Sequence, residues 1–144
     1  NHLCFALKEE KLLFSGDHVM AWSTSIVAPP DGAMADYMAS LVKLTRRDDT
    51  LYWPGHGGAV RNPPRYLRAL IHHRRQREFS ILAALKAGER LIPGIVARVY
   101  EGLDPRLVNA AALSVFAHLE DMVTRGLARA PEGGPALEGV YEAA

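Results

Sequence analysis

Short apolar runs separated by polar turns fill the first sixty residues of the chain. Residues 3–7 and 11–15 are apolar and flank a charged turn, a pattern that predicts a β-hairpin. In residues 32–47 the apolar positions recur at helical spacing after a candidate capping residue, Asp31, which predicts an amphipathic helix. Residues 51–53 are apolar again and indicate a short buried strand. The region is therefore predicted to hold a hairpin followed by a strand–helix–strand unit.

The remainder of the chain is predicted to be mainly helical. An Asn-Pro-Pro start and a glycine stop delimit a helix over residues 62–87, about 36 Å long. Further helices are predicted over 93–100 and 105–126, and the turn-rich residues beyond indicate a two-stranded hairpin. Three helices followed by a hairpin is the order of a winged helix. The predicted parts are a strand-containing region (1–61), a connecting helix (62–87) and a mainly helical domain (88–144).

Composition narrows the class of protein. The 144 residues are 49% apolar, enough for a hydrophobic core, and no apolar run approaches the roughly 18 residues of a membrane span. No secretory signal pattern is present, and Cys4 is the single cysteine, so we expect a cytoplasmic protein without an intrachain disulfide or a membrane partner. The chain starts at Asn1 and enters a strand pattern directly, so we expect it to be the C-terminal portion of a longer protein.

Charge is distributed unevenly along the chain. Residues 61–100 carry nine Lys and Arg against two Asp and Glu, a net charge of +7 between segments of −2 and −4. The helix predicted over 62–87 lies within this basic segment and is a candidate phosphate-binding face, with His73, Arg74 and Arg77 as candidate nucleic-acid contacts. The alternative is a connecting helix whose arginines are solvated or paired with the acidic flanks. The helix over 105–126 has few basic residues, which favours packing or homodimer formation over nucleic-acid binding.

Two polar motifs follow two of the predicted strands. Asp17 lies in "SGDH" after the apolar run 12–15, and His56 lies in "PGHGG" after the run 51–53. A strand–helix–strand unit brings both strand ends to one edge of a sheet, where sites are commonly built. A carboxylate and an imidazole that converge there suit a metal such as Zn²⁺. Each motif alone is also ordinary turn chemistry, but together they favour metal binding.

The order of these motifs resembles the C-terminal half of metallo-β-lactamase-fold hydrolases, the superfamily of glyoxalase II and the lactamase-like endoribonucleases. The first part of the resemblance rests on "LLFSGDHV" (12–19), a helix, and "LYWPGHGG" (51–58). The segments "HHRRQRE" (72–78) and "VFAHLEDMVTRGLA" (115–128) are similar to the winged-helix appendage of the endoribonuclease branch. The resemblance implies an α/β (α+β) fold: the C-terminal half of an αββα sandwich followed by a mainly helical winged-helix domain.

The resemblance also implies roles for individual residues. In the family the aspartate of "SGD" bridges two metal ions and the histidine of "PGHG" ligates the second, roles that fall on Asp17 and His56. The implied cofactor is zinc, two ions in the complete protein, with Mn or Fe as alternatives. His18 is a candidate catalytic proton donor or substrate contact, or else a partly exposed turn histidine. The loop that follows supplies the candidate substrate-binding residues Trp22, Ser23 and Thr24.

The "HxHxDH" and "TPGHT" motifs of the family are absent from these 144 residues. Asp17 and His56 provide two protein ligands, whereas a catalytic zinc takes about three plus water. We therefore expect this chain alone to bind little zinc and to be inactive without the N-terminal half of the same protein. The complete protein is predicted to be a metallo-hydrolase of a small ester, thioester or lactone, or of RNA. The alternative is a non-enzymatic winged-helix module that binds nucleic acid or protein.

Overall fold

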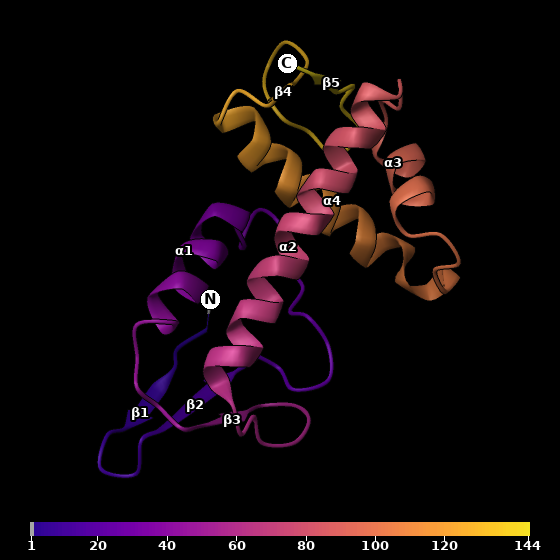
Figure 1. Ribbon diagram of the computed structural model, residues 1–144. Helices are drawn as coiled ribbons and strands as arrows, with labels where there is room; N and C mark the ends of the chain where they lie inside the picture. The colour runs from indigo at the N-terminus through magenta and orange to yellow at the C-terminus, as the bar shows by residue number, and fades with distance from the viewer. Residues whose placement is uncertain (1) are drawn as a thin grey trace. The chain divides into compact units, whose positions relative to one another are not determined.

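A computed structural model describes residues 2–144, which form two compact units (Figure 1). Unit 1 comprises the residues up to Ser25 together with Met38–His73, and unit 2 comprises Ile26–Tyr37 and Arg74–Ala144. Two helices, α1 (Met34–Leu44) and α2 (Pro63–Lys86), each contribute residues to both units.

Unit 1 is built on a three-stranded sheet whose strands lie side by side in Figure 1. β1 (Phe5–Leu7) and β2 (Leu12–Gly16) are antiparallel, which confirms the predicted hairpin. β3 (Leu51–Pro54) runs parallel to β2, with α1 in the connection between them. The strand–helix–strand unit therefore exists as predicted, and the carboxyl ends of β2 and β3 meet at one edge of the sheet.

The two faces of this sheet differ in burial, because successive side chains of a strand point to opposite faces. Leu13 and Tyr52 are paired in register and almost fully buried in unit 1. Phe5, Phe14 and Trp53 are also paired across the three strands, and all of them are exposed. The expectation that 51–53 is a short buried strand is thus wrong for Trp53, which is 54% exposed. An apolar run alone does not distinguish a strand buried on both faces from one buried on one face.

Unit 2 contains the C-terminal part of α2 and three further helical segments around one hydrophobic cluster. Its order of helices followed by two paired strands agrees with the winged-helix prediction. The helix predicted over 105–126 is shorter and begins with a separate 3₁₀ turn, in which the Asp104 carboxylate accepts a hydrogen bond from the Arg106 backbone N–H. The remaining elements are α3 (Ile92–Val99), η1 (Pro105–Leu107), α4 (Val108–Thr124), β4 (Ala128–Arg129) and β5 (Glu142–Ala143).

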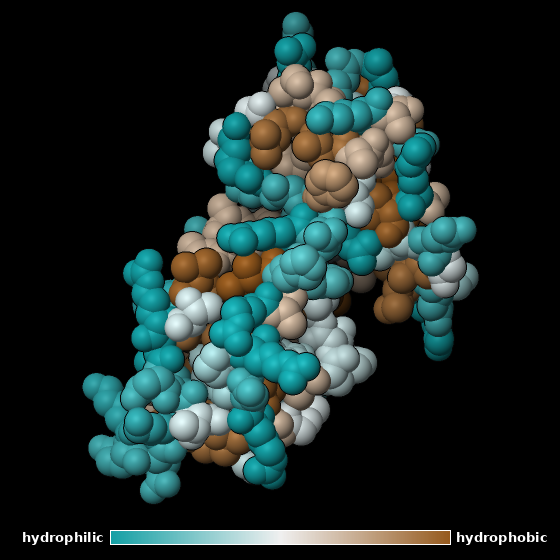
Figure 2. Space-filling model, viewed as in Figure 1, coloured by the Kyte–Doolittle hydropathy of each residue, from teal (hydrophilic) through white to brown (hydrophobic). Residues whose placement is uncertain are grey.

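The long helix α2 begins and ends close to its predicted limits. The Asn62 side chain accepts a hydrogen bond from the Arg65 backbone N–H at 3.2 Å, which caps the N-terminus. Gly88 follows the C-terminus with φ +95°, a conformation that favours glycine. Figure 2 shows many hydrophilic side chains along the course that α2 takes in Figure 1. Across residues 2–144, none of the helices combines the length and apolar character needed to cross a membrane.

Candidate metal centre

The two predicted metal ligands lie together in unit 1. Asp17 follows β2 directly, and His56 is the second residue after β3. The Asp17 Oδ1 atom is 3.6 Å from His56 Nε2. Parallel pairing of β2 and β3 produces this proximity, since both side chains leave the sheet at the same edge. The His56 side chain is 65% exposed, so the site opens to solvent on its histidine side.

The glycines of the two motifs make this approach sterically feasible. A Cβ at Gly55 would lie 2.9 Å from Asp17 Oδ1, too close for a real side chain. Gly57 has φ +88°, and a Cβ there would lie 3.0 Å from the Ala21 Cβ atom. Gly16, at the end of β2, has φ +52°. Each position therefore requires glycine for its conformation, its close contacts or both.

Hydroxyl groups hold the loop that carries Asp17. Ser15 Oγ donates to the Val19 carbonyl at 2.9 Å, which closes the turn around the motif. Ser25 Oγ donates to the carbonyls of Asp17 and His18, the second at 3.1 Å. The Tyr66 hydroxyl, on α2, donates to the Met20 carbonyl at 2.6 Å.

Sequence reasoning missed the roles of these hydroxyls. Ser15 at least belongs to the recognisable "SGD" motif, but nothing in the local pattern around Ser25 or Tyr66 indicates a contact with the loop. The Met20 carbonyl that the Tyr66 hydroxyl bonds lies 46 positions away in the chain.

His18 is directed to α1. Its Nε2 atom shares a 2.9 Å hydrogen bond with Ser40 Oγ. Burial lowers the pKa of His18 below its ordinary value, and the nearby His2 lowers it further. His2 itself is exposed, and its Nδ1 atom lies 3.6 Å from the place a Cβ would take on Gly16.

The surroundings of the Asp17 carboxylate show whether a metal ion fits between Asp17 and His56. Asp17 Oδ1 is shielded from solvent and has no hydrogen-bond partner within residues 2–144. A buried carboxylate oxygen without a partner is costly. Two ligands that each lie about 2 Å from one ion cannot be more than about 4 Å apart, and the 3.6 Å separation meets that limit. The pair therefore fits a shared metal ion.

This pair is not a complete metal site. Residues 2–144 contain no group of three or more His, Cys, Asp or Glu arranged to hold a metal ion. A catalytic zinc takes about three protein ligands and a water. Asp17 and His56 therefore account for a partial ligand set.

Comparison with known proteins identifies the fold. Residues 92–134 match the family described as "Beta-lactamase associated winged helix domain". The chain is 34% identical over 124 residues to the lactamase-like protein vrtG of Penicillium aethiopicum, covering 81% of this chain and 39% of that protein. The metallo-β-lactamase family protein TTHA1429 of Thermus thermophilus has a structure that superimposes with a TM-score of 0.83 at 21% identity, over 99% of this chain and 45% of the other. The chain carries the metallo-β-lactamase fold.

Within that fold the chain corresponds to the C-terminal part, with its winged-helix domain. The chain spans less than half of the length of vrtG and of TTHA1429. One more relative, the atrochrysone carboxyl ACP thioesterase of Aspergillus fumigatus, is 32% identical over 90 residues, covering 62% of this chain and 27% of that protein. The relatives of this chain thus include a hydrolase of thioesters.

Of the predicted substrate-binding residues Trp22, Ser23 and Thr24, Trp22 lies beside the His56 loop. Trp22 is 73% exposed, and its Cδ1 atom would be 3.1 Å from a Cβ at Gly57. The Ser23 hydroxyl is exposed and donates to the Thr24 carbonyl at 3.5 Å. Trp22 is thus the one large side chain of the three, and it stands at the edge of the candidate site.

The candidate nucleic-acid residues have mainly internal contacts in unit 2. Arg74 is only 4% exposed; its Nη1 atom donates to Ser114 Oγ at 3.3 Å, and its guanidinium lies 5.2 Å from the ring centre of Tyr37. Arg77 donates to the Val99 carbonyl at 2.7 Å and stacks 3.9 Å from the ring centre of Tyr100. His73 is exposed. Arg74 and Arg77 thus take part in packing, a role that neither interpretation of the basic helix predicted.

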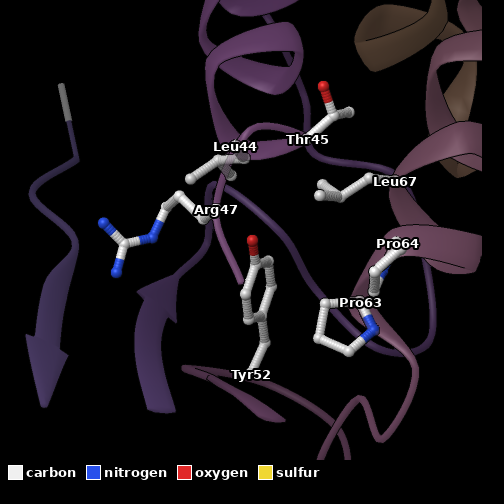
Figure 3. Close-up of a pocket in the computed structure, with 7 residues that line it drawn as sticks. All are labelled: Leu44, Thr45, Arg47, Tyr52, Pro63, Pro64 and Leu67. Carbon is white, nitrogen blue, oxygen red and sulfur yellow. The ribbon is translucent and has the colours of Figure 1, made fainter. Parts of the chain in front are cut away.

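A small pocket in unit 1 contains none of the predicted site residues (Figure 3). The Tyr52 ring stands in it between Arg47 and the two prolines. It leaves no room for even a water-sized molecule, whereas ligand pockets usually begin at roughly 300 Å³. The lining residues are Leu44, Thr45, Arg47, Tyr52, Pro63, Pro64 and Leu67.

Proposed function

We propose that this chain supplies part of the metal site of a metal-dependent hydrolase, with Asp17 and His56 as ligands. One observation carries the proposal: a shielded carboxylate oxygen without a hydrogen-bond partner faces an imidazole nitrogen 3.6 Å away. Both groups are on loops that follow parallel strands, and glycines clear the space between them. The remaining ligands come from protein outside these 144 residues.

The residues of this chain hold the cofactor and admit the substrate. The proposed cofactor is zinc, two ions in the complete protein, with Mn or Fe as alternatives. When bound, such ions activate a water near neutral pH and stabilise the negative charge that develops on an acyl oxygen. Asp17 would hold the ions through its carboxylate, and His56 would hold them through its imidazole nitrogen on the solvent-exposed side.

The proposed substrate class is a small ester or thioester. A related protein is a thioesterase, which supports acyl transfer to water as the reaction. Trp22 offers an exposed apolar surface beside the His56 loop, suited to the apolar part of an acyl group. An RNA substrate has less support, because Arg74 and Arg77 are engaged within the protein.

The metal content of the full-length protein tests the proposal. In Asp17→Asn the side chain keeps its shape but loses its charge, so we expect bound metal to fall severalfold relative to the wild type, measured by elemental analysis after dialysis. Asp36→Asn removes an exposed carboxylate from α1 and serves as the matched control. Wild-type metal content in Asp17→Asn would refute the proposed ligand. The 144-residue chain alone is expected to retain little zinc.

A further inference from the structure

We propose that His18 is a positioning residue for Asp17, and that its hydrogen bond with Ser40 on α1 sets the metal affinity of the site. The inference rests on the proposed function, because it takes Asp17 as a metal ligand. It assigns a role to Ser40, a helix residue 23 positions from that ligand in the sequence.

The peptide between Asp17 and His18 is tied at several points. The His18 backbone N–H donates to the Ser15 carbonyl at 3.1 Å. Ser25 Oγ bonds the carbonyls of both residues from the other side of the loop. These bonds restrain the backbone, and the Ser40 Oγ atom, 2.9 Å from Nε2, anchors the His18 ring to α1.

The partner of the His18 ring lies on a rigid element. Ser40 is in the middle of α1, and the adjacent Leu41 is completely buried. A hydroxyl on a well-packed helix has little freedom to move, so it holds the ring in one orientation. Through the ring, α1 restrains the loop that ends β2.

The Asp17 carboxylate has little tolerance for movement. Its Oδ1 atom lies against Gly55, at 2.9 Å from the position of a hypothetical Cβ, and 3.6 Å from His56 Nε2. A site of this kind needs its groups within about 0.5 Å of the productive geometry. Residues 17 and 18 share a peptide unit, so a His18 ring anchored to α1 adds to the backbone hydrogen bonds that restrain this unit and, through it, the carboxylate.

The positioning role differs from the proton-donor hypothesis. A proton donor must place its nitrogen within hydrogen-bond reach of the substrate. The His18 Nε2 atom instead engages the Ser40 hydroxyl. A positioning role requires a hydrogen-bonding atom at the position of the His18 Nε2 atom, but it does not require a group that gains or loses a proton. Glutamine can therefore replace histidine in this role.

The experiment uses the full-length protein, with Zn²⁺ as the probe and a chelator in competition. We expect Ser40→Ala to weaken zinc affinity by about tenfold to 100-fold, the range for residues that orient metal ligands. Ser40→Thr keeps the hydroxyl and should restore most of the affinity. The control is Ser80→Ala, since the Ser80 hydroxyl bonds only to the Gln76 carbonyl of its own helix. Unfolding of the zinc-free variants should differ little from the wild type.

His18→Gln provides the second variant and separates the two roles. We expect it to bind zinc more tightly than His18→Leu and to keep hydrolytic activity. Loss of activity with wild-type zinc affinity in His18→Gln would establish a proton donor and overturn the positioning role. Wild-type zinc affinity in Ser40→Ala would also overturn it. If Asp17→Asn lowers metal content while Ser40→Ala does not, the positioning role fails and the proposed function stands; if neither does, the proposed function fails.

Discussion

The loops at the sheet edge of unit 1 and the helical core of unit 2 are held by different forces. The loop between Ser15 and Ser25 is fixed by hydroxyl-to-carbonyl hydrogen bonds and by the conformation of Gly16. Unit 2 is closed around a cluster of twelve buried residues, among them Ile95, Val115 and Leu119. The loop is held by polar interactions of defined geometry, and unit 2 is held by the packing of apolar side chains.

This difference predicts which measured property each region controls. A hydrogen bond of the loop contributes about 0.5–1.5 kcal/mol net to stability, so its main effect is to orient the groups that it joins. A buried leucine of the core contributes about 2–5 kcal/mol relative to alanine. Substitutions in the two regions are therefore expected to change different measured quantities: metal affinity for the loops and the free energy of unfolding for the core.

The largest expected effect is on the core of unit 2. Leu119, on α4, is completely buried, so Leu119→Ala should lower the free energy of unfolding by about 2–5 kcal/mol, measured in urea. Metal affinity of the folded protein should remain close to that of the wild type. Leu107→Ala is the control, because Leu107 is half-exposed in η1. An equal loss in both variants would contradict the assignment of stability to this cluster.

A smaller effect is expected from a single methyl group at the sheet edge. Gly55→Ala would put a Cβ 2.9 Å from Asp17 Oδ1, so we expect the carboxylate to shift and zinc affinity to fall by about tenfold, with a minor change in unfolding. Gly58→Ala is the matched control, since a Cβ at Gly58 meets nothing within 4 Å. Chelator competition on the full-length proteins measures both. Equal affinities would show that the carboxylate tolerates displacement.

The effect that is smallest at neutral pH concerns the buried face of the sheet, because it appears only at high pH. Burial, with the negative charge of Asp49 nearby, raises the pKa of Tyr52 to about 12 from its ordinary value of 10.0. The neutral phenol is therefore favoured in the folded state. Its stabilising effect is complete below about pH 10 and is lost as pH rises from 10 toward 12. Tyr52→Phe should lose less stability than the wild type across that interval, as urea unfolding at several pH values would reveal. Parallel pH profiles would contradict the raised pKa.

The sequence predicted the pairing of Asp17 and His56 because the pairing follows from local signals. Two apolar runs with an intervening helix imply parallel strands, and parallel strands place their carboxyl ends at one edge. The caps of α2 and η1 are equally local, since Asn62 and Asp104 bond backbone groups two or three residues away. Ser25, Ser40 and Tyr66 were missed because their partners lie 7 to 46 positions away in the chain.

The amino-acid composition of the basic helix α2 does not determine the environment of each of its arginines. Its sequence is consistent with either a phosphate-binding face or a connecting helix whose arginines are solvated or paired with acidic residues. Only the folded structure shows that the Arg74 guanidinium is covered by Tyr37 and Ser114, while Arg65 and Arg68 remain exposed. Arginines with the same charge thus have different environments because each points to a different side of one helix.

The sequence by itself determined the order of the elements, most of their limits, and the two motifs that end the parallel strands. These features depend on periodicity, capping and turn conformation, which act over a few residues. Tertiary structure alone decided which face of the sheet is buried, which arginines are internal, and that the His18 ring is held by a helix. Those outcomes depend on contacts between distant segments, whose free energy is gained only when the chain has folded.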